Sequence, residues 1–187
     1  MLEIAAKLGA DVPFFLLGGT ALGLGRGTEI YAIPEVRRQW MVVTHPCVHV
    51  NTARAYAMLD PDMLEEKGKE NAQRAALTES VEQDRIYSFC AGLLAPQAGL
   101  TGSELVNDFE PVVFATYPQI ARLKKQLMRL GATPALLSGS GSAVYGLCDS
   151  RQRAEKIARG LRARFPEYGV WVVRTVGASE SLRMQGE

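Results

Sequence analysis

The sequence has few cysteines, no long apolar run and almost no net charge. Its three cysteines, at positions 47, 90 and 148, form no C-x-x-C pair, which favours a reducing cytoplasm over a disulfide framework. The best candidate for a membrane span, Val12 to Leu24, is broken by glycines and a threonine and is shorter than the roughly 18 to 20 residues that a bilayer crossing requires. The N-terminus has no basic region before an apolar stretch, so it does not resemble a secretory signal. We therefore expect a cytoplasmic protein that does not bind membranes.

Charge and composition narrow the class further. The 187 residues include 21 Lys and Arg against 20 Asp and Glu, and this even balance argues against a nucleic-acid partner. Apolar residues make up 47% and charged residues 22%, which is typical of a globular chain with a packed core. The length predicts one domain, or one domain with an appendage.

Before residue 40, the pattern predicts one short helix and one hairpin. Leu2 to Leu8 is expected to be a short amphipathic helix that ends at Gly9. Phe14 to Leu24 and Thr28 to Ile33 are expected to be strands joined through a glycine-rich turn. The glycines at 23, 25 and 27 are not a dinucleotide fingerprint, because no helix with a following acidic residue comes after them.

From Trp40 onward, the predicted order is strand, helices, strand, strand, helix, strand. This order is typical of an α+β fold in which helices cover an antiparallel or mixed sheet of the split β-α-β type. The predicted elements are a strand over 40–44, helices over 52–59, 86–94 and 118–130, strands over 135–138 and 143–148, a helix after Ser150 and a strand over 170–173. Residues 61–78 are polar and are expected to form a solvated helix or a connection.

A serine-glycine turn is the first candidate for chemistry. Ser138, Gly139, Ser140, Gly141 and Ser142 lie between two apolar strands, where glycines permit close approach and hydroxyl and N–H groups suit anionic oxygens such as those of phosphate. An ordinary hairpin turn uses the same small residues. It is not a P-loop, because no Gly-Lys-Ser or Gly-Lys-Thr follows.

Asp11 is the second candidate. It lies after the end of a helix and directly before an apolar run, so its carboxylate could act as a general base toward a substrate hydroxyl if a cation orients it. The alternative is that Asp11 only binds backbone groups in its turn.

For two further segments, a structural role explains the residues as well as a ligand-binding role does. His45, Cys47 and His49 alternate along an extended segment, but a zinc site needs a fourth ligand that is not evident nearby, so we predict no metal site there. Asn107 or Asp108 could cap a helix, and a ligand role for this segment is possible but not required.

Taken in order, these segments resemble the 4-diphosphocytidyl-2-C-methyl-D-erythritol kinases of the GHMP kinase superfamily. The resemblance is nearly residue for residue over 8–27, and it continues through 50–56, 107–111 and 136–146. It implies that residues 1–39 are a remnant of the N-terminal GHMP kinase domain. Residues 40–187 would then be the C-terminal, ferredoxin-like domain.

The resemblance implies transfer of the γ-phosphoryl group of ATP to the 2-hydroxyl of 4-diphosphocytidyl-2-C-methyl-D-erythritol, an isoprenoid precursor of the non-mevalonate pathway. Asp11 would be the catalytic base, Thr52 and Asn107 would bind substrate, and residues Ser138 to Ser142 would lie near the phosphates, with Mg²⁺ accompanying the nucleotide. The resemblance covers almost the whole chain and suits a monomer or homodimer.

One departure from the family pattern sets the alternative. Family members carry, ahead of the position that corresponds to Met1, a segment with a catalytic lysine and a glycine-rich phosphate loop. This sequence contains neither of these features. The expectation is therefore that this chain is either part of an active kinase or a remnant that only binds substrate or other subunits.

Overall fold

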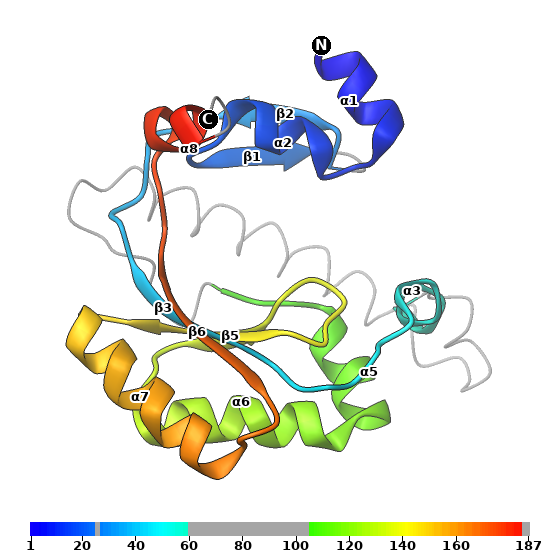
Figure 1. The fold of residues 1–187 in the computed structure, drawn as a ribbon. Coiled ribbons are helices and arrows are strands. Elements are labelled where there is room, and N and C mark those ends of the chain that lie inside the picture. The colour runs from blue at the N-terminus through cyan, green and yellow to red at the C-terminus, as the bar shows by residue number, and fades with distance from the viewer. Residues whose placement is uncertain (25–26, 60–104, 185–187) are drawn as a thin grey trace, which may run out of the picture. The chain divides into compact units, whose positions relative to one another are not determined.

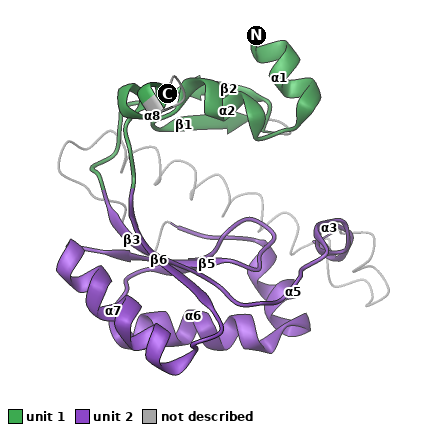
Figure 2. Cartoon of the chain, viewed as in Figure 1, with its two compact units in different colours: residues 1–38, 175–187 green, residues 39–174 purple. Residues whose placement is uncertain are grey.

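The computed structural model describes residues 1–24, 27–59 and 105–184, and these residues form two units. Unit 1 comprises residues 1–38 and 175–187, and unit 2 comprises residues 39–174 (Figure 2). Residues 175–184 thus pack with residues 1–38, whereas the predicted C-terminal domain of 40–187 included them. The assignment of residues 1–39 to a kinase N-terminal domain stays a prediction. Within the described ranges, every helix is too short or too polar to cross a bilayer.

Unit 1 contains a hairpin and three short helices. Its elements are α1 (Leu2–Leu8), α2 (Val12–Leu17), β1 (Ala21–Leu24), β2 (Glu29–Ala32) and α8 (Ala178–Met184) (Figure 1). The antiparallel pairing of β1 with β2 confirms the predicted hairpin, and α1 confirms the predicted first helix.

The predicted strand from Phe14 is wrong over its first residues, which form α2. Pro13 occupies the first turn of this helix, where its fixed φ is favourable and its missing N–H costs nothing. Gly18 ends the helix with a φ of 64°, and its N–H donates to the carbonyl of Phe14. A short apolar run cannot be assigned to helix or strand by periodicity alone, which explains the error.

Helix α8, for which the sequence pattern gave no signal, contacts the segment before β3. The Glu35 carboxylate accepts a hydrogen bond of 2.7 Å from the N–H of Ala178 at the start of α8. Arg38 forms an ion pair of 2.9 Å with Glu180. Glu35 thus supplies the carboxylate that a free helix N-terminus favours, and the ion pair adds a second link between the same two segments.

The described part of unit 2 contains a four-stranded antiparallel sheet with two helices on one face (Figure 1). Its strands are β3 (Trp40–His45), β4 (Ala135–Leu137), β5 (Val144–Cys148) and β6 (Gly169–Arg174), in the order β4-β5-β3-β6. Helices α6 (Pro118–Leu130) and α7 (Arg151–Arg164) pack against this sheet and against each other. The order confirms the α+β, split β-α-β prediction.

The caps and the buried faces of α6 and α7 are those that the sequence pattern predicts. Gly131 ends α6 in the left-handed region with a φ of 103°, and the Ser150 hydroxyl accepts a hydrogen bond from the N–H of Arg153 at the start of α7. The side chains at helical spacing are buried in the core: Ile120, Leu123 and Leu127 on α6, and Ala154, Ile157, Ala158 and Leu161 on α7.

Two shorter helices, α3 (Thr52–Leu59) and α5 (Phe109–Thr116), complete the described part of unit 2. The helix predicted over 86–94 and the polar segment 61–78 lie outside the described residues.

Replacing Leu127 by Ala should destabilise unit 2, because its side chain is fully buried between α6 and the sheet. Deletion of a buried leucine costs about 2–5 kcal/mol. Urea unfolding followed by tryptophan fluorescence measures the change, since both tryptophans, Trp40 and Trp171, belong to unit 2. Met128→Ala is the matched control: this neighbour is 50% exposed, so its midpoint should move far less. Equal shifts in the two variants would contradict the described packing of α6.

Candidate functional site

The serine-glycine turn joins β4 to β5. The N–H of Ser138 donates to the carbonyl of Ala143 at 2.9 Å, and the N–H of Gly141 donates to the carbonyl of Ser138 at 3.0 Å. Gly139 and Gly141 have φ values of 56° and 95°, a region that side chains disfavour. The two glycines are therefore needed for this turn whatever its function.

Asn107 holds the turn to the start of α5. Its Nδ2 donates to the carbonyls of Leu137 and Gly139, both at 2.8 Å, while its Oδ1 accepts from the N–H of Phe109 at 2.9 Å. Between the two cap candidates, the structure thus selects Asn107, because the Asp108 side chain makes no capping hydrogen bond. These hydrogen bonds join residues that lie about thirty positions apart in the sequence.

Thr52 reaches the same turn from α3. Its Oγ1 lies 2.9 Å from the Oγ of Ser140, within hydrogen-bond distance. The cap of α3 is Asn51, whose Oδ1 accepts from the N–H of Arg54 at 2.9 Å. The structure therefore brings together Thr52, Asn107 and the turn, which the sequence analysis selected from separate segments.

The two ends of the turn differ in exposure. Ser138 and Gly139 are exposed and Ser140 is half-buried, whereas Ser142 is only 5% exposed. The Oγ of Ser142 lies 3.2 Å from Nε2 of His45 and 3.5 Å from the carbonyl of Pro46. An incoming ligand can reach the Ser138 end, while the Ser142 end is bound into the protein.

The alternating His-Cys-His segment does not converge on a common point. His45 contacts Ser142, and the thiol of Cys47 donates to the carbonyl of Glu167 at 3.1 Å. Over the part of the chain that the structure describes, no three His, Cys, Asp or Glu side chains are grouped to hold a metal ion. The contacts of His45 and Cys47 give both residues structural roles.

Glu110 and Tyr145 are site neighbours that sequence reasoning missed. Oε1 of Glu110 accepts from the N–H of Leu137 at 3.0 Å, and Oε2 accepts from Nζ of Lys124 at 2.5 Å. Burial raises the pKa of the Tyr145 phenol, and the negative charge of Glu110 raises it further. No local sequence signal predicts these pairs, because their partners lie on other elements.

An open groove of about 650 Å³ lies beside the exposed end of the turn. Residues of α3, α5, β4, β5 and the turn line it, including Tyr56, Phe109, Leu136, Ser138, Gly139 and Tyr145. The rings of Tyr56 and Phe109 meet edge to face, with centroids 4.9 Å apart. The volume of the groove falls in the range of small-molecule binding sites.

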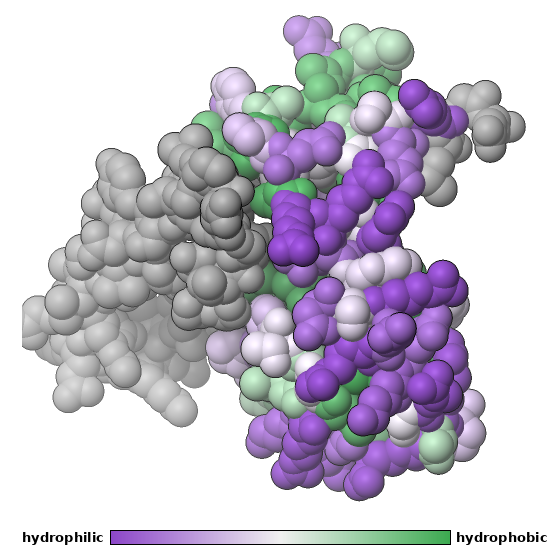
Figure 3. Space-filling model, turned by 90° about the vertical axis from the view of Figure 1, so that its left-hand side faces the viewer, coloured by the Kyte–Doolittle hydropathy of each residue, from purple (hydrophilic) through white to green (hydrophobic). Residues whose placement is uncertain are grey.

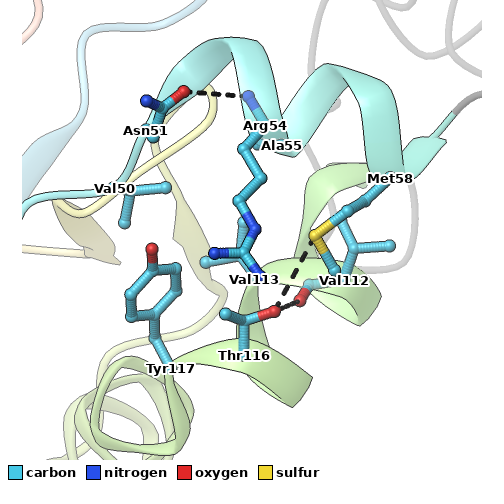
Figure 4. Close-up of a pocket in the computed structure, with 9 residues that line it drawn as sticks. All are labelled: Val50, Asn51, Arg54, Ala55, Met58, Val112, Val113, Thr116 and Tyr117. Carbon is cyan, nitrogen blue, oxygen red and sulfur yellow. Dashed lines mark hydrogen bonds between the residues drawn. The ribbon is translucent and has the colours of Figure 1, made fainter.

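A second hollow, between α3 and α5, is a packing feature. Figure 4 shows the side chain of Arg54 reaching from α3 toward Val113 and Thr116. The remaining space is about 10 Å³, which is close to the minimum for one water molecule. The Oγ1 of Thr116 donates to the carbonyl of Val112 at 2.9 Å. This hollow is too small for a substrate.

Asp11 belongs to unit 1, whereas the turn belongs to unit 2. Its side chain is exposed and makes no capping hydrogen bond at the start of α2, and its backbone carbonyl accepts from the N–H of Phe14 at 3.2 Å. The carboxylate is thus accessible to solvent in its own unit. That Asp11 and the turn share one cleft stays a prediction.

Comparison with known proteins identifies the class. Residues 88–167 match the family model described as GHMP kinases C terminal. A crystal structure of 4-(cytidine 5'-diphospho)-2C-methyl-D-erythritol kinase matches 94% of this chain and 57% of that chain, with a TM-score of 0.62 and 27% identity. The α+β unit with its serine-glycine turn thus matches the C-terminal domain of GHMP kinases in sequence and in fold.

Within the superfamily, the relatives are 4-diphosphocytidyl-2-C-methyl-D-erythritol kinases. The protein of that name from Solibacter usitatus is 45% identical over 149 residues, which are 80% of this chain and 43% of the relative. The one from Bacillus subtilis is 32% identical over 180 residues, which are 96% of this chain and 56% of the relative. The chain spans about half the length of the curated relatives it matches.

Asn107→Ala should loosen the turn and destabilise unit 2, because it leaves the carbonyls of Leu137 and Gly139 without their donor. Loss of a hydrogen bond that leaves a partly buried group unsatisfied costs about 1–3 kcal/mol. Hydrogen exchange at residues 138–141 and urea unfolding measure the two effects. The control is Asp108→Ala, whose side chain caps nothing. If this control destabilises unit 2 as much as Asn107→Ala does, the assigned role of the Asn107 carboxamide is wrong.

Tyr145 should ionise later than an exposed tyrosine. The pKa of Tyr145 is raised in the folded state, whereas a tyrosine in the unfolded chain has a pKa of about 10. The contribution of Tyr145 to stability is therefore fully present below about pH 10 and is lost as pH rises through the pKa of the folded state. Absorbance titration at alkaline pH should therefore show a late phase that Tyr145→Phe removes. Tyr31→Phe, which alters a 54% exposed tyrosine of unit 1, should leave that phase intact. Persistence of the late phase in Tyr145→Phe would assign it to another group.

Proposed function

We propose that this chain is part of an ATP-dependent kinase that phosphorylates the 2-hydroxyl of 4-diphosphocytidyl-2-C-methyl-D-erythritol. The names of its relatives support this substrate. The observation that carries the proposal is the meeting of Thr52 and Asn107 at the serine-glycine turn. Asn107 and the turn lie within the residues that match the family model described as GHMP kinases C terminal.

The proposed reaction is an in-line transfer. The substrate oxygen forms a bond to the γ-phosphorus, the bond from that phosphorus to the bridging oxygen of ADP breaks, and the hydroxyl proton passes to the carboxylate of Asp11. Phosphoryl transfer depends mainly on positioning and on stabilising charge over the transferred oxygens. Asp11 therefore has to be near the hydroxyl in the assembled enzyme, and its exposed carboxylate is accessible for that role.

The two ends of the turn would have different tasks. The hydroxyls of Ser138 and Ser140 are accessible and suit contact with phosphate oxygens or with substrate beside Thr52. Ser142 is buried against His45, so its task would be to hold the base of the turn. The five residues act together as a rigid support with one open end.

ATP and Mg²⁺ fit this site to different degrees. The hydroxyl and amide groups of the turn are the donor types that bind phosphate oxygens. Mg²⁺ prefers carboxylate and water oxygens together with nucleotide phosphates, and the described residues hold no carboxylate cluster for it. We therefore assign no protein ligand to Mg²⁺ and derive no step through it.

The direct test is turnover by the purified chain and by a chimera. In the chimera, the residues of the Solibacter usitatus kinase that precede its region of alignment are joined to Met1 of this chain. ADP release, measured by a coupled assay, should depend on the cytidyl substrate. The proposal is wrong if the chimera folds but neither it nor the chain turns over, while the intact Solibacter enzyme does under the same conditions. Calorimetric binding of the cytidyl substrate without turnover would instead support a binding module.

In the active protein, Asp11→Asn should lower kcat by about 10²-fold or more, because a positioned general base contributes 10²–10⁴-fold. Glu29→Gln is the control, since it removes an exposed carboxylate from β2 of the same unit. Circular dichroism should show that both variants fold. Retained turnover in Asp11→Asn would mean that the carboxylate is not the base.

A further inference from the structure

The helix layer of unit 2 concentrates the positive charge of the chain. Helix α6 carries four basic residues and no acidic one, and α7 carries six basic residues and one acidic one. Their formal charges of +4 and +5 amount to +9, while the whole chain carries +1, so the remaining residues carry −8. The two helices cover one face of the sheet, and hydrophilic residues dominate the visible side of unit 2 in Figure 3. The even charge of the sequence conceals this asymmetry.

Part of this charge converges on a groove. Arg122, Lys125 and Arg129 recur along one side of α6, and Arg164 reaches the same groove from the end of α7. The groove measures about 640 Å³, and Glu167 is the one carboxylate among its described lining residues. Side chains three and four residues apart on a helix are neighbours, so the α6 cations repel one another.

Most of the other basic residues of α6 and α7 have a carboxylate or carbonyl partner. Lys124 pairs with Glu110, and Arg151 pairs with Glu155 at 2.8 Å. Side chains of Arg153 and Arg162 donate to the carbonyls of Gly131 and Val170, respectively.

The groove cations differ from these engaged ones. Within the described residues, Arg122, Lys125 and Arg129 have no carboxylate, carbonyl or aromatic partner. Arg164 lies 6.0 Å from the centre of the Phe165 ring, which stacks in parallel on Tyr168 at 5.0 Å. Four exposed cations therefore face one hollow with little to neutralise them.

We propose that this groove binds a short linear polyphosphate, either as inorganic tripolyphosphate or as the phosphate tail of a nucleotide. The rise of an α-helix places residues 122 and 129 about 10 Å apart, so a chain of phosphates can contact both ends of the cluster where a single phosphate cannot. Arginine binds phosphate oxygens in a fixed, two-pronged geometry. The volume suits a small molecule. The groove shares no residue with Thr52, Asn107 or the serine-glycine turn, so this inference does not depend on the proposed function.

Calorimetric titration of the full chain with sodium tripolyphosphate tests the proposal. The double variant Arg122→Gln/Arg129→Gln should bind about tenfold or more weakly, because each charge-assisted contact is worth more than a neutral one. The matched control is Lys156→Gln/Arg159→Gln, which removes the same charge from the same helix layer outside the groove and should change affinity by about twofold at most. Circular dichroism verifies folding of both.

The remaining comparisons identify the ligand and the site. Equal affinity for ATP and tripolyphosphate would support recognition of the phosphates alone, and tighter binding of ATP would support an added base contact at Phe165 and Tyr168. Equal losses in the two double variants would overturn the proposal in favour of a diffuse field. It would also be overturned if the wild-type chain bound no tripolyphosphate, if it bound only an RNA homopolymer, or if Ser138→Ala/Ser140→Ala abolished binding.

Discussion

The side-chain amide of Asn107 is the interaction on which the candidate site depends. It donates twice into the β4–β5 connection and accepts once from the first turn of α5. A carboxylate at this position would place negative charge against two carbonyls, and an alkyl group would leave three backbone groups without this partner. The backbone of the turn is therefore held by a side chain from a remote segment. The hydroxyl of Ser138 is exposed beside it, and the hydroxyl of Ser140 lies within hydrogen-bond distance of Thr52.

Local signals explain what the sequence could predict in unit 2. Pro118, Gly131 and Ser150 act through their own backbone neighbourhood, and the apolar spacing of α6 and α7 requires only that one helix face be buried. The error at α2 has the same origin: its six residues are too short for periodicity to separate helix from strand. Elements that are long and capped are thus predictable, and short apolar ones are not.

The site contacts depend on pairs that are distant in sequence. Glu110 meets the N–H of Leu137 and the ammonium of Lys124 only after α5 and α6 have packed beside β4. Ser140 meets Thr52 across 88 positions. The sequence could indicate which residue types suit phosphate chemistry, but the division of the turn into a buried base and an open end depends on tertiary packing. Asp11 belongs to the other unit, so its predicted role beside this turn has no counterpart among the contacts within unit 2.

The basic helix layer imposes a cost that the rest of unit 2 must offset. Unpaired like charges on one helix destabilise it, while the buried stripe of Ile120, Leu123 and Leu127 stabilises the same helix from its other side. That buried apolar face, together with the pair of Lys124 and Glu110, holds α6 in unit 2, and the exposed cations of the groove take no part in these contacts. A concentration of cations there is therefore not required by folding. Neutralisation by a bound polyphosphate would relieve the repulsion and stabilise the native state in proportion to its occupancy.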